Sequence, residues 1–150
     1  LPAEFIGFAA LGPCCKVGRR AVQERGLEMM VEIYIGAESD FAERDRKVVA
    51  QGELEIGVFL IDGAFYAYEN RCPHMGGPVC QGRILNRVEE VLADDKTSQG
   101  LKWAEEDIHI VCPWHGYEFN LKTGHHPGSS KVRLRRFEVK LRDGDVYVIV

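Results

Sequence analysis

Two short runs of the sequence each pair one cysteine with one histidine, and these four side chains have the clearest chemical potential in the chain. The first run, Cys72–Pro78, carries His74, and the second, Cys112–Gly116, carries His115. Thirty-seven residues lie between His74 and Cys112. Four thiolate and imidazole donors satisfy either one tetrahedral zinc ion or a [2Fe–2S] cluster with two protein donors per iron. The two runs therefore predict a metal centre.

The composition of both runs favours the cluster over zinc. Two neutral histidines in place of two anionic thiolates remove negative charge from an iron–sulfur site, so the reduction potential rises. Gly76, Gly77 and Gly116 allow the backbone to approach a cluster without a Cβ clash, and prolines stiffen both turns. Structural zinc loops usually space their cysteines by about two to four residues. Zinc is the alternative interpretation of the same four donors.

The other cysteines and histidines are expected to have no ligand role. The chain has five cysteines, an odd number that argues against a disulfide framework. Cys80 is expected to be a small buried apolar side chain. His109 alternates with two isoleucines and is expected to face outward from a strand. His125 and His126 stand side by side in a Gly/Pro-rich stretch and are expected to be solvent-exposed loop residues.

The four donors must be positioned by the surrounding structure. From residue 27 onward, much of the sequence alternates apolar with polar residues, as β-strands do, and has turn residues between these stretches. Asp62-Gly63 is a strong hairpin signal because both residue types tolerate a positive φ angle, and the stretch 142–145 is a similar turn near the end of the chain. Strands are therefore predicted at 27–35, 47–50, 53–61, 64–69, 137–141 and 146–150.

One segment between the two runs departs from this pattern. The stretch 84–96 has apolar residues at helical spacing and predicts a short amphipathic helix. The wider insertion, 84–107, holds three basic and seven acidic residues, whereas 131–142 holds six basic and one acidic. The surface is therefore expected to be polarised, and the insertion is a candidate steering element for a basic partner. Its four acidic residues singled out for this role are Glu89, Glu90, Asp94 and Asp95.

Length and charge limit the possible functions. The 150 residues suit one domain, and a formal net charge of −4 lacks the basic character of a nucleic-acid-binding protein. No segment approaches the roughly 20 apolar residues that span a bilayer, and a cytoplasmic location is expected from the cysteine pattern. Residues 1–26 are interpreted as an N-terminal extension in which Cys14 and Cys15 are incidental. The sequence begins at Leu1, so an upstream segment can have been removed.

Cys-x-His in one run and Cys-x-x-His-Gly in the other resemble the signature of Rieske [2Fe–2S] proteins, over roughly residues 27–150. The resemblance implies an all-β fold of three antiparallel sheets with the cluster loops at one tip, to which the pattern at 84–107 adds a short helical insertion. It also implies one Rieske-type [2Fe–2S] cluster. The residues that match the family's ligands are Cys72, His74, Cys112 and His115.

The sequence differs from the high-potential members of this family in respiratory and photosynthetic complexes. Those members link their loops by a disulfide between two further cysteines, and here these positions are Gly77 and Trp114. They also place a serine and a tyrosine to hydrogen-bond to sulfur, where this chain has Tyr117 and Phe119. Cys-Pro-Trp-His-Gly is instead similar to ferredoxins and oxygenase components of ring-hydroxylating and demethylating systems, which implies a low potential. Trp114 is expected to shield the cluster.

The resemblance implies a soluble one-electron carrier that is not catalytic alone. A flavin-dependent reductase would supply the electron, and a terminal oxygenase or similar redox enzyme would receive it. The alternative is a small Rieske subunit or truncated Rieske domain of a larger oxidoreductase of the oxygenase or nitrite reductase type. An oxygenase would need a further iron held by two histidines and a carboxylate, and only His109, His125 and His126 are left to supply it.

Overall fold

Strands account for almost all regular structure in residues 30–150, the part of the chain that this computed structural model describes. The proposed extension, 1–26, lies outside the described residues, as do Cys14 and Cys15. Two 3₁₀ turns, η1 Glu38–Asp40 and η2 Val79–Gln81, interrupt the strands. The strands are β1 Glu32–Ala37, β2 Arg46–Gln51, β3 Leu54–Ile61, β4 Ala64–Glu69, β5 Arg83–Leu92, β6 Ser98–Val111, β7 Glu118–Asn120, β8 His125–His126, β9 Ser129–Arg133, β10 Arg136–Arg142 and β11 Asp145–Ile149.

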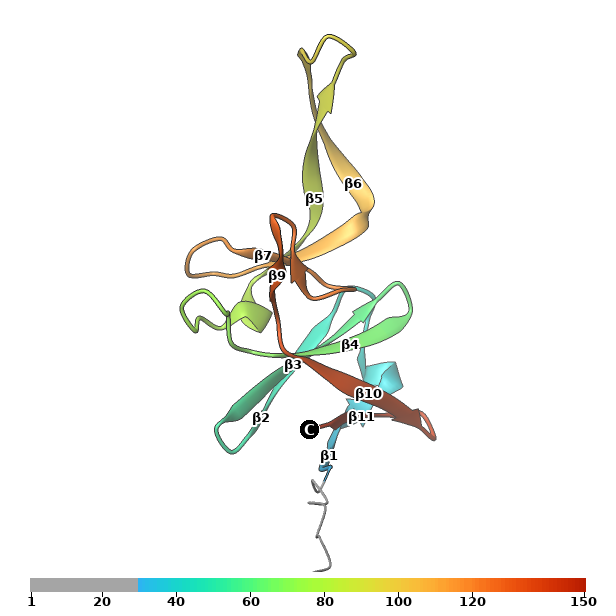
Figure 1. Cartoon of the computed structure of the whole chain (residues 1–150). Helices are drawn as coiled ribbons and strands as arrows, with labels where there is room; N and C mark the ends of the chain where they lie inside the picture. Colours follow the sequence, from blue (N-terminus) through green and yellow to red (C-terminus); the bar gives the residue numbers. More distant parts are fainter. Residues whose placement is uncertain (1–29) are drawn as a thin grey trace, which may run out of the picture.

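The strands form three antiparallel sheets, as expected (Figure 1). The largest has six strands in the order β1-β11-β10-β4-β3-β2, and two smaller sheets contain β5-β6-β7 and β8-β9. The two predicted hairpin turns are confirmed, because Asp62-Gly63 and Asp143-Gly144 have positive φ angles at both residues. Strand β1 begins at residue 32, and residues 27–29 of the strand predicted at 27–35 lie outside the described residues.

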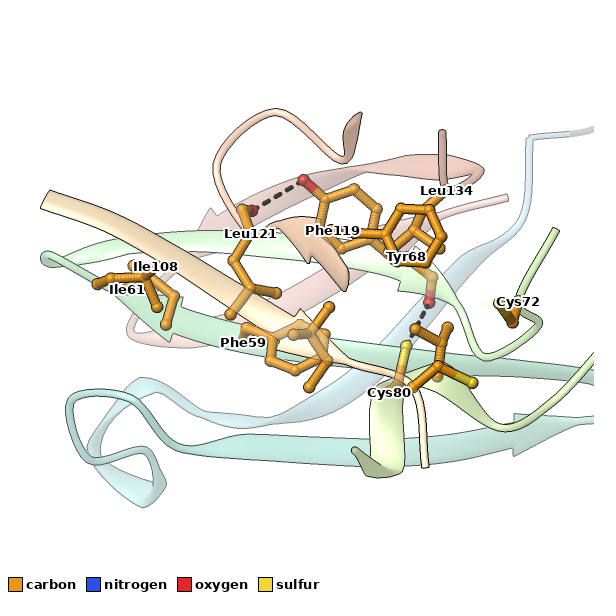
Figure 2. Packing of buried hydrophobic residues seen from close by; sticks show 12 residues of the cluster. Phe59, Ile61, Tyr68, Cys72, Cys80, Ile108, Phe119, Leu121 and Leu134 are labelled. Carbon is orange, nitrogen blue, oxygen red and sulfur yellow. Dashed lines mark hydrogen bonds between the residues drawn. The ribbon is translucent and has the colours of Figure 1, made fainter. Parts of the chain in front are cut away.

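Two buried clusters hold these sheets together. One lies within the six-stranded sheet and includes Ile56, Val58 and Val148. The other joins β3 and β4 to the smaller sheets, and it contains both Cys72 and Cys112 among its buried residues. Figure 2 shows Tyr68 in this second cluster, where its hydroxyl donates a hydrogen bond of 2.8 Å to the Leu121 carbonyl. The loops that carry the predicted donors are therefore anchored in a packed core.

The predicted helix at 84–96 is wrong, because this stretch forms most of β5 and pairs with β6 in a long hairpin that projects from the rest of the molecule (Figure 1). Ile84, Val88 and Leu92 are four residues apart, which fits a helix face but equally fits one face of a strand. A helix is a local structure, whereas this strand depends on a distant partner, since Val88 lies opposite Trp103. The helical insertion of the expected fold is thus a β-ribbon.

A bulge bends this hairpin near its base. Asn86 lies opposite Ile108, but the next registered pair is Val88 with Trp103, so β6 has extra residues here. The Asn86 amide donates to the carbonyls of Ala104 and Glu105, at 2.9 and 2.8 Å. Its oxygen accepts a hydrogen bond from Arg44 at 2.9 Å. The side chain of Asn86 thus provides hydrogen bonds to backbone carbonyls in the bulge and links the bulge to Arg44, which precedes β2.

Candidate metal centre

The first predicted run forms a tight loop after β4. The Gly76 N–H donates to the Cys72 carbonyl at 2.7 Å, and the Cys72 N–H donates to the Gly77 carbonyl at 2.8 Å. Gly76 has a φ of +77°, a conformation that residues with a Cβ rarely adopt. These two hydrogen bonds fold the loop back on itself and leave Pro73, His74 and Met75 exposed at its tip.

The second run repeats this geometry between β6 and β7. The Gly116 N–H donates to the Cys112 carbonyl at 3.1 Å, and the Cys112 N–H donates to the Tyr117 carbonyl at 2.7 Å. Gly116 has a φ of +71°. In both loops the N–H of the cysteine donates to the carbonyl of the residue five positions later, and a glycine lies four positions after the cysteine.

The two thiols lie together beneath the loops. Cys72 and Cys112 are each only 3% exposed. Burial raises the pKa of the Cys72 thiol, and the Cys112 thiol within hydrogen-bonding reach adds to this rise. The backbone N–H groups of His74 and Met75 point at the Cys72 sulfur and act in the opposite direction, because they stabilise a thiolate. The pair therefore occupies a dry site that already offers hydrogen bonds to anionic sulfur.

The two imidazoles lie together on the outside. The rings of His74 and His115 have centroids 4.9 Å apart and are nearly perpendicular, and both residues are exposed. No group of three or more His, Cys, Asp or Glu side chains in residues 30–150 is arranged to hold a single metal ion. The donors are instead sorted by type, with sulfur paired with sulfur and imidazole with imidazole. This sorting fits a [2Fe–2S] cluster with two cysteines on one iron and two histidines on the other.

Aromatic rings pack around the histidines. Tyr117 stacks on His74, with ring centroids 4.1 Å apart and an 8° angle between the planes. Tyr117 also contacts His126, with ring centroids 5.3 Å apart and the planes tilted by 45°. Trp114 meets His115 edge to face at 6.3 Å. The contact between Tyr117 and His74 could not be predicted from the sequence, because the two residues are far apart in the chain.

The two loops also contact each other directly. A Cβ built at Gly77 would lie 2.8 Å from the indole of Trp114, so the ring can pack here only because residue 77 is a glycine. These are the positions at which the resemblance places a disulfide in high-potential members. Here an indole packed on a glycine connects the loops instead. Trp114 is 58% exposed, so it covers the loop junction while presenting a large apolar surface to solvent.

The remaining cysteine in the described region has the place expected for it. Cys80 is fully buried, and its sulfur lies 3.7 Å from the carbonyls of Tyr68 and Glu69 (Figure 2 shows the first contact). Burial raises the pKa of this thiol to about 12. It is therefore a protonated core residue.

Two expectations about histidines are wrong. His109 does not face solvent, because it is 1% exposed and its Nε2 lies 2.8 Å from Asp107, with Glu118 3.4 Å from its other nitrogen. Neighbouring polar side chains of the sheet cover it. His125 and His126 are half-buried and form strand β8 rather than an exposed loop. Contacts with Ser130 and with Tyr117, respectively, hold them in place.

Paired thiols, paired imidazoles and two matched loops on antiparallel sheets define an iron–sulfur domain of the electron-transfer class. The chain belongs to the Rieske [2Fe-2S] domain family, whose family model matches residues 31–137. Membership in this family implies a [2Fe–2S] cluster as the cofactor.

Several curated proteins are similar to this chain. Ferredoxin CarAc of Metapseudomonas resinovorans is 31% identical over 105 residues, which are 69% of this chain and 78% of that protein. Human apoptosis-inducing factor 3 is 33% identical over 104 residues, which are 64% of this chain and 13% of that protein. The human Rieske domain-containing protein is 29% identical over 96 residues, or 61% of this chain and 48% of that protein. The chain thus spans less than half of the length of these two human relatives.

Solved structures have the same fold. The ferredoxin–oxygenase complex of carbazole 1,9a-dioxygenase contains a chain that is 28% identical, with a TM-score of 0.56 over 78% of this chain and 91% of that one. A putative NADH-dependent nitrite reductase small subunit from Mycobacterium tuberculosis has a TM-score of 0.60 over 82% and 97% of the two chains. At 15% identity it supports the fold alone.

In residues 30–150 no helix has the length and apolar character needed to cross a membrane.

Proposed function

We propose that this chain carries single electrons on a Rieske cluster held by Cys72 and Cys112 at one iron and by His74 and His115 at the other. The observation that carries the proposal is the sorting of the four donors, with the two thiols buried together and the two imidazoles exposed together. When bound, the cluster would accept and release one electron at a time.

The residues of the chain would perform three tasks around that chemistry. The core beneath Cys72 and Cys112 keeps water from the sulfur side of the site. The backbone N–H groups of His74 and Met75 would stabilise the anionic sulfur of Cys72. Tyr117 would hold the His74 ring in one orientation by stacking on it. The exposed imidazole edges would then be the place where a partner approaches closely enough to exchange an electron.

The proposed partners are a flavin-dependent reductase that supplies the electron and a terminal oxygenase or similar enzyme that receives it. Ferredoxin components of oxygenase systems are among the proteins similar to this chain, which supports the oxygenase half of this assignment. A cytoplasmic location is part of the same proposal. The alternative is a small Rieske subunit of a larger oxidoreductase, and co-purification of a large, stably bound subunit from the native host would favour it.

The direct test is chemical and spectroscopic. Purified protein is assayed for iron, acid-labile sulfide and zinc, and the dithionite-reduced sample is examined by EPR. We expect about two irons and two sulfides per chain and a Rieske-type signal from the reduced cluster. Stoichiometric zinc without iron would instead identify a zinc site and overturn the proposal.

A further inference from the structure

A hollow of about 390 Å³ opens beside the first cysteine loop. One side is formed by the loop itself, including His74 and Met75. The other lining side chains come from two further stretches of chain. Glu69 ends β4 and Arg71 lies just before the loop, whereas Arg133 ends β9 and Arg135 lies just before β10. A proposed cluster ligand and a set of arginines thus face the same space.

The hollow is basic. Arg71, Arg133 and Arg135 are all exposed, and Glu69 is the one carboxylate among the lining residues. Glu69 lies 3.6 Å from Arg135. Within residues 30–150, neither Arg71 nor Arg133 forms an ion pair. Two guanidinium groups beside the proposed electron-exit edge therefore have unused capacity for a carboxylate, which arginine binds in a bidentate manner.

The charge changes sign across Arg71. On its other side, a second hollow is lined by Glu53, Glu55 and Glu69. Next to both lies an apolar tip, where Met75 is 64% exposed and Trp114 is 58% exposed. An apolar centre with charged groups at its rim is the usual anatomy of a transient interface. Because the rim is basic on one side and acidic on the other, it can fix the orientation of a partner as well as attract it.

The acidic hairpin is less well placed for this task. Asp94 and Asp95 lie between β5 and β6 at the far end of the ribbon, roughly 30 Å from its base for a strand of this length. At physiological ionic strength, charges are screened over about 8 Å. Charges at the far end of the hairpin therefore act weakly at the cysteine loops, whereas the three arginines lie beside them.

We infer that this basic hollow docks an acidic redox protein, whose carboxylates pair with Arg71 and Arg133 while its redox group faces His74. The inference deepens the proposed function and rests on it. A macromolecular occupant fits better than a small anion, because the arginines are exposed and spread along an open rim rather than buried around one point. When loaded with its cluster, the protein would give up one electron, and the redox group of the docked protein would be reduced by that one electron.

The test uses two haem proteins of opposite charge as electron acceptors. The reduced holoprotein is mixed in a stopped-flow instrument with ferric cytochrome b5, which is acidic, or with ferric cytochrome c, which is basic. The variant Arg133→Glu reverses one charge in the hollow at a residue that is not next to a proposed cluster ligand in the sequence. The double variant Arg71→Glu/Arg133→Glu reverses two charges. Lys131→Glu is the matched control, since it makes the same charge change on β9 at a residue that does not line the hollow. Visible absorption and midpoint potential are measured first for every variant.

We expect the double variant to reduce cytochrome b5 at least about tenfold more slowly than wild type at low ionic strength. The difference should shrink as salt is added. Cytochrome c should respond in the opposite direction, and Lys131→Glu should change either rate far less. An intact cluster with unchanged rates would overturn the docking inference and leave the proposed function standing, whereas absence of the cluster would overturn the proposed function itself.

Two further outcomes would assign the hollow to a different occupant. Inhibition by inorganic phosphate beyond that of chloride at equal ionic strength would indicate a small-anion site. A salt-sensitive dimer of the wild type that Arg133→Glu dissociates, measured by sedimentation, would indicate that the acidic hairpin of a second copy fills the hollow. Either result would overturn the assignment to an acidic redox protein.

Discussion

In the first cysteine loop the histidine follows the cysteine by two positions, and in the second by three, although the same pair of backbone hydrogen bonds closes both loops. His74 therefore has the loop position of Trp114, and Met75 has that of His115. The backbone pattern is set by the cysteine and the glycine four positions later, and these are common to both runs. The two loops therefore share one backbone fold, but the histidine stands one position later in the second loop, so the two imidazoles have different neighbours. His74 stacks on Tyr117, whereas His115 meets both His74 and Trp114 edge to face.

The largest expected effect comes from removing a donor from either loop. His74→Ala or His115→Ala should abolish the visible absorbance of the cluster, because one iron would lose one of its four ligands. Absorption spectroscopy and iron content measure this. Cys80→Ser is the control and should leave the spectrum unchanged. Full retention of the cluster in either histidine variant would reject the assignment of that histidine as a ligand.

The second prediction concerns the contact that replaces a loop disulfide. Gly77→Ala should lower the midpoint of thermal unfolding, because its Cβ would lie 2.8 Å from the Trp114 ring and overpacking costs roughly 1–3 kcal/mol. The double variant Gly77→Ala/Trp114→Leu should recover part of the loss, since a smaller side chain makes room. If Gly77→Ala alone is as stable as wild type, the indole does not connect the loops.

The third prediction uses the repeated glycines as a matched pair. Gly76→Ala and Gly116→Ala should each destabilise the protein by about 1–2 kcal/mol, because both residues have a positive φ and alanine is strained there. An added Cβ meets nothing closer than 3.8 Å at Gly76 and nothing within 4 Å at Gly116, so strain is the only cost. Denaturant unfolding of the two variants measures it. Clearly unequal losses would show that the two loops are not equivalent scaffolds.

The fourth prediction concerns potential. Neither loop has the disulfide cysteines, and Tyr117 and Phe119 stand where high-potential members have a serine and a tyrosine. The midpoint should therefore lie near the lower end of the Rieske range, about −150 mV rather than +300 mV. Protein-film voltammetry gives the value directly. A midpoint well above zero would contradict the low-potential assignment.

The smallest effect is expected at the ring that distinguishes the two imidazoles. Tyr117→Leu should reduce the stability of the loaded protein by about 0.5–1.5 kcal/mol, the usual contribution of an aromatic pair. Tyr117→Phe keeps the ring and should preserve the stability. If both variants behave alike, the stacking on His74 has no energetic role, and the two histidines differ less than their surroundings indicate.

Much of this site could be predicted because its determinants are local. The conformations of the Asp-Gly turns and of the Cys-His loops depend on residues that are adjacent in the sequence. The hairpins and the position of the loops could therefore be inferred from the sequence. The ribbon at 84–107 could not, because the spacing of Val88 and Leu92 suits two structures and the choice depends on a partner strand about 15 residues away along the chain. The prediction that His109 faces solvent is wrong for a similar reason, since Asp107 and Glu118 cover this residue only once β6 and β7 are paired.

The hairpin has a consequence for how the molecule opens. Beyond the bulge, where Asn86 forms its hydrogen bonds, β5 and β6 pair only with each other among the described strands. Leu101 and Trp103 in this part of β6 are 73% and 62% exposed. An isolated two-stranded hairpin is marginally stable, so its outer amides should exchange with deuterium through local opening at little free-energy cost. The amide of Ile110, a core residue that pairs with both β5 and β7, should exchange only when the whole domain unfolds. One continuous strand, β6, is therefore expected to span almost the full range of local stability in this protein.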